Sequence, residues 1–505
     1  MNRSEAKDLA LVLAVAFLAS LAWCLTKGRT IEGDDAIMGL MALKISRGQE
    51  FPVFFWQAHY SGPIASYLAA PLHWFFKPSP MVLHSVIVPI HLFYSAGMYF
   101  LARAWLGQRE AMIVGLFAAL PGQLFPYSAL GGFTESMAFV PWIFLLCLEE
   151  RQGSKLQYLR FLGGGFLCGF ALWVFPLAFP PVVACFICQY RAYGGKAFKL
   201  SIMGCFLALL PTIFYNVSQP GATLLRLFSR PPALDRQTVS QLVSSEGIIS
   251  FLLHSLGKWA LASYEAFLSV PHFTLSLLDL EADATVWSHI SGVITFFALL
   301  LGLWAFFRYQ GKAKNIPDAI LVTVIMTYCF LVLFGLNRDR YLIPILLIVP
   351  FGLSLSIQRL AVFLRWRLTA IAVASILLLN LLANFSDTKT RYPDYQGLAG
   401  FLETKELFFG YAPYTMAYPL IYLTDEKLIY TPAFQEPQYD RCSAYTVLLS
   451  KQRYPAFVFL NTLASKDFRA QLERLSIVPQ EERRDGFIIF HHLSAYVNIR
   501  LFQDR

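Results

Sequence analysis

Long apolar runs recur through most of this chain, and they decide what it can fold into. The runs are about 15–24 residues long, and a helix of about 20 residues crosses a hydrocarbon layer roughly 30 Å thick. Backbone groups inside lipid must be hydrogen-bonded within the protein, so each run predicts a membrane-spanning helix. The eleven predicted spans are about 8–26, 80–103, 110–126, 134–149, 159–175, 176–190, 198–215, 287–307, 317–335, 341–357 and 368–385.

Composition agrees with a membrane protein. Hydrophobic residues make up 56% of the 505 and charged residues only 14%, against about 25% charged in a soluble protein. The net charge of +9 is explained by basic cytoplasmic loops and gives no reason to expect nucleic acid as a partner. The first apolar run has basic residues ahead of it and no small-residue cleavage site after it, which predicts a retained signal anchor.

The basic residues also orient the predicted spans. With the N-terminus in the cytoplasm, every even-numbered connection is cytoplasmic and carries two or three Lys or Arg, as the positive-inside rule requires. Lys27 and Arg29 run against the rule, so the orientation depends on the loops taken together. The sequence therefore predicts a multi-pass α-helical protein of an inner or plasma membrane, with a transmembrane domain at 1–385. The regions predicted outside are a first loop at 27–79, a long loop at 217–286 and the C-terminal residues 386–505.

The C-terminal region has the pattern of a small α/β domain. Its predicted elements are strands at Phe457–Leu460 and Gly486–His491, a helix at Ser465–Leu475 with Ser465 as N-cap, and a hairpin pairing Tyr418–Leu423 with Lys427–Tyr430. It contains no Gly-rich phosphate loop and no metal-ligand spacing. We expect it to act as a lid or packing module over the membrane part.

The first loop concentrates acids beside the membrane, at Glu32, Asp34 and Asp35. Apolar residues at helical spacing follow, so we expect a helix with one apolar face lying in the membrane interface. A helix N-terminus keeps a carboxylate ionised, and an ionised carboxylate can act as a general base on a hydroxyl. Asp34 and Asp35 are therefore the candidate catalytic residues, although helix capping alone could explain one of the two.

Trp56, His59 and Tyr60 form a second group of candidates in the same loop. Their rings could stack on a sugar, or they could be interfacial aromatics beside a helix that begins near Pro63. Glu135 is predicted at the same outer surface, where it either caps a helix or shares a cavity with Asp34. Two acids at one site could hold a divalent cation, but the sequence requires no cofactor.

Arginines in a predicted outside turn are candidates for binding phosphate. Arg338 and Arg340 either extend to outer headgroups or grip phosphate oxygens with their planar guanidinium groups. In the long loop, His254 and Lys258 lie four residues apart on one helix face, which makes them further candidates for substrate binding.

Several of these features together resemble the GT-C superfamily of integral membrane glycosyltransferases, in the style of the protein O-mannosyltransferase and aminoarabinose-transferase families. The matching features are Gly33-Asp34-Asp35-Ala36 after the first span, Tyr60-Ser61-Gly62-Pro63 in the first loop, Glu135, the Arg-Tyr-Leu-Ile-Pro string at 340–344, and a soluble domain following outside. The family's Asp-Glu pair is Asp-Asp here, and the Lys-Pro-Pro frequent in that loop is Ser61-Gly62-Pro63.

The resemblance implies a sugar donor linked to a polyprenyl phosphate in the membrane. It implies that Asp34 deprotonates an acceptor hydroxyl, which attacks the anomeric carbon with inversion, while Arg338 or Arg340 steadies the departing phosphate. The acceptor could be a glycan, a lipid or a protein, and the transferred sugar a hexose or a pentose.

Three other functions stay open at this point. A transporter or flippase of lipid-linked sugars would usually carry ionisable residues inside its spans and related halves, whereas the acids here lie in predicted loops. An oligosaccharide polymerase or ligase also works outside on polyprenyl-linked donors. A non-catalytic scaffold is the third.

Overall fold

The computed structural model describes residues 2–120, 131–149, 156–223, 315–334, 344, 347–363, 394–432, 440–452, 454–461, 463–495 and 497. These residues form two compact units. Unit 1 is drawn from Met1–Thr26, His59–Gly62 and Ile87–Thr388, and unit 2 from Lys27–Ala58, Pro63–Val86 and Lys389–Arg505. The first predicted loop therefore contributes mainly to the same unit as the C-terminal region.

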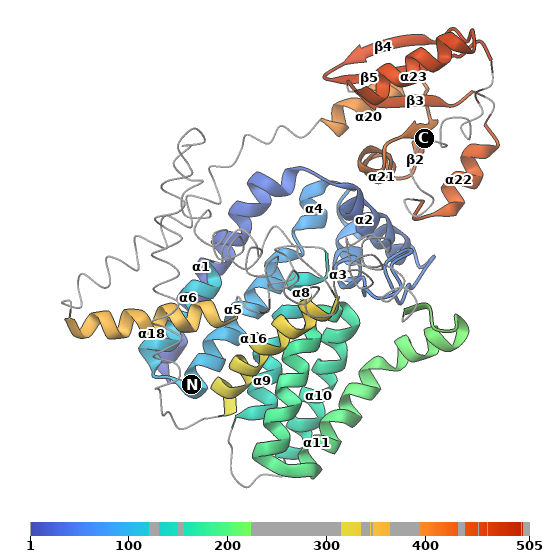
Figure 1. Ribbon diagram of the computed structural model, residues 1–505. Coiled ribbons are helices and arrows are strands. Elements are labelled where there is room, and N and C mark those ends of the chain that lie inside the picture. Colours follow the sequence, from blue (N-terminus) through green and yellow to red (C-terminus); the bar gives the residue numbers. More distant parts are fainter. Residues whose placement is uncertain are drawn as a thin grey trace, which may run out of the picture. The chain divides into compact units, whose positions relative to one another are not determined.

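Unit 1 contains helices and no strands among its described residues (Figure 1). Its helices are α1 (Arg3–Thr26), α5 (Ile87–Trp105), α6 (Gln108–Ala119), α8 (Phe133–Ala138), α9 (Val140–Leu148), α10 (Leu156–Val174), α11 (Phe179–Ser218), α16 (Asn315–Phe334) and α18 (Ile348–Phe363). Helices α1, α5 and α6 pack on one another, and α11 packs on α9, α10 and α16. The predicted spans at 287–307 and 368–385 lie outside the described residues.

Three helical stretches of the described chain are long and apolar enough to cross a membrane: Arg3–Leu25, Pro80–Trp105 and Pro176–Ser218. The last includes two spans that the sequence predicts separately, at 176–190 and 198–215. They run into one another as α11, with a kink where Gly194 adopts a left-handed φ of 74°. Glycine tolerates this backbone conformation because it has no Cβ.

A stripe of glycines on α10 lets α10 and α11 pack closely. A Cβ on Gly165 would collide with the backbone of Ser201, and one on Gly169 with the backbone of Cys205. The Ser201 hydroxyl also donates a hydrogen bond of 2.8 Å to the carbonyl of Phe161. Small residues at a helix interface let the two backbones approach in this way, and Figure 1 shows the two helices side by side.

Unit 2 contains a five-stranded sheet within the described residues, in the order β2-β1-β3-β5-β4. The strands are β1 (Phe409–Ala412), β2 (Ile429–Pro432), β3 (Ala456–Leu460), β4 (Gln480–Arg484) and β5 (Phe487–His491). Strands β2, β1 and β3 are parallel, whereas β5 pairs antiparallel with both β3 and β4. The predicted strands at 457–460 and 486–491 are found as β3 and β5, in a parallel–antiparallel sheet whose buried cluster includes Phe457, Phe468 and Phe490.

Helices complete unit 2. Those of the C-terminal region are α20 (Tyr395–Thr404), α21 (Tyr414–Leu423), α22 (Ser443–Ser450) and α23 (Leu463–Arg474), and those from the first loop are α2 (Gly33–Ser46), α3 (Ile64–Ala69) and α4 (Pro80–His84). Short 3-10 turns lie at Lys27–Arg29 and Ala70–Trp74. Helix α23 begins at Leu463, so Ser465 is a buried residue inside it and not its N-cap.

The predicted hairpin is wrong, because residues 418–423 belong to helix α21. Strand β2 pairs in parallel with β1, and α21 connects the two. The aromatic residues that favour a strand here recur instead at helical spacing, as Tyr414, Tyr418 and Tyr422. Packing overrides the intrinsic strand preference, since α21 lies against α2.

Helix α2 is enclosed more fully than its sequence predicts. Ala36–Leu43 are eight consecutive buried residues, whereas a helix with one apolar face would alternate between buried and exposed positions. Its glycines admit α21 at close range, since a Cβ on Gly33 would meet the Tyr414 ring and one on Gly39 the Tyr422 ring. Because α21, α3 and the 3-10 turn at Ala70–Trp74 all pack on α2, it is a core helix of unit 2.

Candidate functional site

Asp34 lies in the first turn of α2, where the positive end of the helix favours a carboxylate. The residue is exposed, and the hydroxyl of Tyr414 donates a hydrogen bond to its Oδ1. An ionised carboxylate offers about four lone-pair sites on its two oxygens. The phenol therefore orients Asp34 and leaves it the capacity to accept a proton from a second hydroxyl.

Tyr414 is well suited to remain a donor. Burial, and next the negative charge of Asp34, raise the pKa of the Tyr414 phenol far above its ordinary value. The hydroxyl consequently stays protonated across the physiological range. Sequence reasoning missed this residue, because its partner is 380 positions away in the chain and no local pattern joins them.

Asp35 is the third residue of α2 and helps to cap the N-terminus of the helix. It forms a capping box with Glu32, whose side chain accepts from the Asp35 main-chain N–H and whose own main-chain N–H donates to Asp35 Oδ2 at 3.4 Å. The same oxygen lies 3.4 Å from Nε2 of the buried His84. These contacts fit the capping role that the sequence left open, and a catalytic role for Asp35 stays a prediction.

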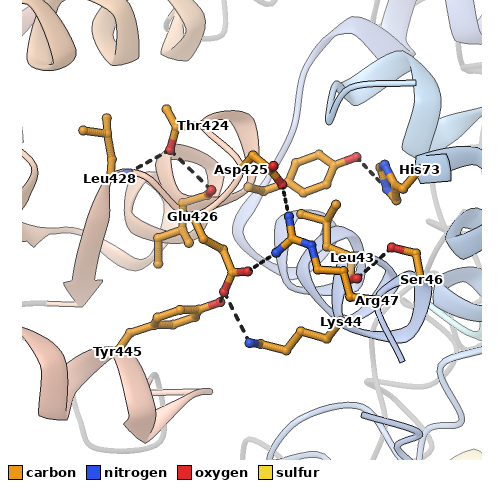
Figure 2. A network of polar contacts seen from close by, with 12 residues as sticks. Leu43, Lys44, Ser46, Arg47, His73, Thr424, Asp425, Glu426, Leu428 and Tyr445 are labelled. Carbon is orange, nitrogen blue, oxygen red and sulfur yellow. Dashed lines mark hydrogen bonds and ion pairs between the residues drawn. The ribbon is translucent and has the colours of Figure 1, made fainter. Parts of the chain in front are cut away.

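The opposite end of α2 carries a network of ion pairs with the loop after α21 (Figure 2). Arg47 donates to Asp425 and, at 2.5 Å, to Oε2 of Glu426. Glu426 Oε1 also lies 3.3 Å from Lys44 Nζ and accepts a 2.7 Å hydrogen bond from the Tyr445 hydroxyl. We call these five residues the α2 latch, because they join the first loop to the C-terminal region.

Glu426 is the centre of the α2 latch. Burial acts to raise its pKa, but the hydrogen bond from Tyr445 and the charges of Lys44 and Arg47 outweigh it and hold the pKa below its ordinary value. The carboxylate is therefore ionised at neutral pH, and its side chain is only 19% exposed. Partial burial makes such pairs stronger than those on an open surface.

Trp56 belongs to unit 2 and is partly buried. Its indole N–H donates a hydrogen bond of 3.1 Å to Oε2 of Glu50. The contact fixes the ring within the first loop. A role for Trp56 in binding sugar stays a prediction.

His59 and Tyr60 belong to unit 1, in the short segment His59–Gly62. The main-chain N–H of Gly62 donates to the carbonyls at the end of α10, at 2.9 and 3.1 Å. His59 Nδ1 lies 2.6 Å from the Tyr215 hydroxyl, and the Tyr60 ring meets the edge of Phe175 at 5.9 Å between centroids. The segment is thus an integral part of the helical unit.

Glu135 is buried in α8, with 1% of its surface exposed. Its Oε2 accepts a hydrogen bond of 3.2 Å from the Thr134 hydroxyl. The preceding turn packs beside the His59–Gly62 segment, because Gly132 lies against both Phe175 and the Ser61 hydroxyl. A functional role for Glu135 in unit 1 stays a prediction.

The predicted site residues thus fall into two groups. Asp34, Asp35 and Trp56 belong to unit 2, and His59, Tyr60 and Glu135 to unit 1. A cation site shared by Asp34 and Glu135 stays a prediction, and within the described residues no group of three His, Cys, Asp or Glu is placed to hold a metal ion. Arg338, Arg340, His254 and Lys258 lie outside the described residues.

Comparison with known proteins gives a match in structure only. No protein-family model matches the sequence, and no curated protein matches it. The fold is similar to that of ArnT from Cupriavidus metallidurans bound to undecaprenyl phosphate, with a TM-score of 0.64 and 12% identity over 98% of this chain and 99% of ArnT. It is also similar to the oligosaccharyltransferase AglB from Archaeoglobus fulgidus in complex with an inhibitory peptide and a dolichol-phosphate, with a TM-score of 0.53 and 13% identity over 90% of this chain and 69% of AglB.

Both neighbours are membrane glycosyltransferases of the GT-C superfamily. The likeness confirms the GT-C fold that the sequence predicts, over nearly the whole chain. The fold and the apolar helices together identify an integral membrane protein.

Proposed function

We propose that this protein is a glycosyltransferase that takes a sugar from a polyprenyl-phosphate donor and transfers it to an acceptor hydroxyl at the outer face of the membrane. The observation that carries the proposal is the exposed Asp34, held at the N-terminus of α2 by the Tyr414 hydroxyl. The fold supports it, because one structural neighbour binds undecaprenyl phosphate and another a dolichol-phosphate.

In the proposed reaction Asp34 is the general base. The acceptor O–H gives its proton to the carboxylate while the oxygen forms a bond to the anomeric carbon of the sugar. The bond between that carbon and the phosphate oxygen breaks on the opposite face, so the configuration inverts. The electron pair leaves with the polyprenyl phosphate, where Arg338 or Arg340 would stabilise the charge.

Transfer by the purified full-length protein tests the proposal, with defined polyprenyl-phosphate sugars and candidate acceptors. We expect Asp34→Asn to lower the rate of transfer by about 10²–10⁴-fold, because a positioned general base contributes that much. Asp467→Asn is the matched control, since Asp467 is an exposed aspartate on α23 and should leave the rate unchanged.

Two results would contradict the proposal. Equal transfer by wild type and Asp34→Asn at matched expression would remove Asp34 from the role of base. Movement of the lipid-linked sugar across a bilayer without any transfer would indicate the transporter instead.

A further inference from the structure

Arg441 is a second polar residue of unit 2 that sequence reasoning missed. Its main-chain N–H donates a hydrogen bond of 2.6 Å to the Tyr418 hydroxyl, which fixes the residue beside α21. Its guanidinium carbon lies over the Phe55 ring, 5.6 Å from the centroid. A guanidinium over a ring face keeps its N–H groups in its own plane, where they can still bind an anion.

The Arg441 side chain holds buried donors that the described residues do not satisfy. Its Nε and Nη1 are both inaccessible to water, and neither makes a hydrogen bond within the part of the chain that the structure describes. The Phe55 ring and the Tyr414 phenol lie beside the Arg441 side chain, but leaving two further donors of a charged group unsatisfied is costly. The arrangement is therefore the kind that an anionic ligand completes.

Arg441 also lies close to the Asp34–Tyr414 pair. The Tyr418 ring, whose hydroxyl accepts from the Arg441 main chain, packs edge-on against the Tyr414 ring with 5.4 Å between centroids. Burial and Asp34 raise the pKa of the Tyr414 phenol, and the charge of Arg441 and a hydrogen bond with its side chain act against them. One side of unit 2 thus brings together a carboxylate, a phenol that donates to it, and a guanidinium with donors to spare. A reaction that moves a proton to the carboxylate and leaves negative charge on a phosphate needs these two kinds of group near each other.

We propose that Arg441 binds the phosphate group of the donor, so that the C-terminal region supplies a substrate-binding residue to the Asp34 site. The planar guanidinium fork fits phosphate oxygens in a bidentate way, which favours phosphate as the anion. The identity of the phosphate as part of a polyprenyl-phosphate donor rests on the proposed function. The binding of phosphate by Arg441 rests on the geometry of the residue itself.

Binding of undecaprenyl phosphate to the full-length protein in detergent tests this inference without knowledge of the sugar. We expect Arg441→Met to weaken binding about tenfold or more, Arg441→Lys to weaken it less, and binding of undecaprenol, which lacks the phosphate, to stay unchanged. Arg483→Met is the matched control, because the Arg483 side chain is 64% exposed. The melting temperature of each variant verifies that it is folded.

A binding measurement with inorganic phosphate distinguishes a lipid-linked phosphate from a free phosphate as the ligand. Weakened binding of undecaprenyl phosphate supports a lipid-linked ligand, whereas weakened binding of inorganic phosphate alone would overturn that source. Should Arg441→Met fail to fold, Arg441→Lys tests the inference in its place, because lysine keeps the charge and loses the planar fork, and its affinity for undecaprenyl phosphate should be below that of wild type.

Unchanged affinity of the folded Arg441 variants for both ligands would overturn the inference. That result would not touch the proposed function, which depends on the loss of transfer in Asp34→Asn. The opposite combination is also informative. If phosphate binding depends on Arg441 but Asp34→Asn still transfers sugar, this inference holds and Asp34 loses its catalytic role.

Discussion

The charged side chains at the two ends of helix α2 have different surroundings. At the N-terminal end, Asp34 is exposed and accepts a hydrogen bond from one phenol, that of Tyr414. At the C-terminal end, Lys44 and Arg47 enter the dense α2 latch with Glu426 and its neighbours. Both ends contact the C-terminal region of the chain. They differ in how many polar contacts their charged side chains make there.

The difference indicates that one end of α2 stabilises the position of the helix and the other end carries the reactive group. Charges that are fully engaged stabilise a position but cannot take part in a reaction, whereas an accessible carboxylate can bind a hydroxyl. The α2 latch would hold the helix in place about three turns from Asp34, and the N-terminal end would keep the group that reacts. Four substitutions or conditions test whether the two ends of α2 differ in this way.

Charge reversal in the α2 latch should have the largest effect on stability. Glu426→Lys places a third cation beside Lys44 and Arg47, and we expect unit 2 to lose roughly 2–3 kcal/mol, because breaking a partly buried pair leaves its partners uncompensated. The melting temperature of the full-length protein should fall. The double variant Arg47→Glu/Glu426→Lys should recover part of the loss, and a double variant no better than the sum of its singles would contradict the pairing.

Tyr414→Phe should affect the reacting end with less effect on stability. The ring still fills the space beside Gly33, but the donor to Asp34 is lost. We expect the rate of transfer to fall by about 10–100-fold, since a hydrogen bond to a charged group is worth about 1.5–3 kcal/mol. An unchanged rate of transfer in the folded variant would show that the phenol does not act through Asp34.

Acid should weaken the α2 latch through Glu426. The pKa of Glu426 in the folded protein is below its ordinary value of 4.5. Its contribution to stability is therefore complete above about pH 4.5 and is lost as the pH falls through the folded pKa. Melting temperatures of wild type and Glu426→Gln should converge on acidification, and a constant difference down to low pH would argue against this titration.

The capping box should give the smallest effect. Glu32→Ala removes the side chain that accepts from the Asp35 N–H, and we expect a loss of about 0.5–1 kcal/mol, typical of an N-cap. Glu473→Ala on the exposed face of α23 serves as the control in the same melting experiment. A loss as large as that of Glu426→Lys would mean that the N-terminal end also anchors the helix.

Helices and strands that depend on a local residue pattern could be predicted from the sequence. Apolar length predicts helices of unit 1, and the absence of a Cβ at Gly165 and Gly169 lets α10 approach α11. Short runs of aromatic and β-branched residues predict β3 and β5. In each case the physical cause, such as the thickness of a hydrocarbon layer or the space that a Cβ occupies, acts within one segment.

Only the tertiary structure decides what surrounds Asp34. Residues 418–423 favour a strand locally and become part of a helix because α21 must fit the glycines of α2. Tyr414 and Arg441 carry no local signal of function, since their meaning comes from a segment almost 400 positions earlier in the chain. The acids stand out in the sequence because they are charged residues beside an apolar run. Hydrophobic burial is not directional, so the sequence does not show which distant segment packs beside them. The phenol of Tyr414 and the guanidinium of Arg441 were therefore found only in the folded chain.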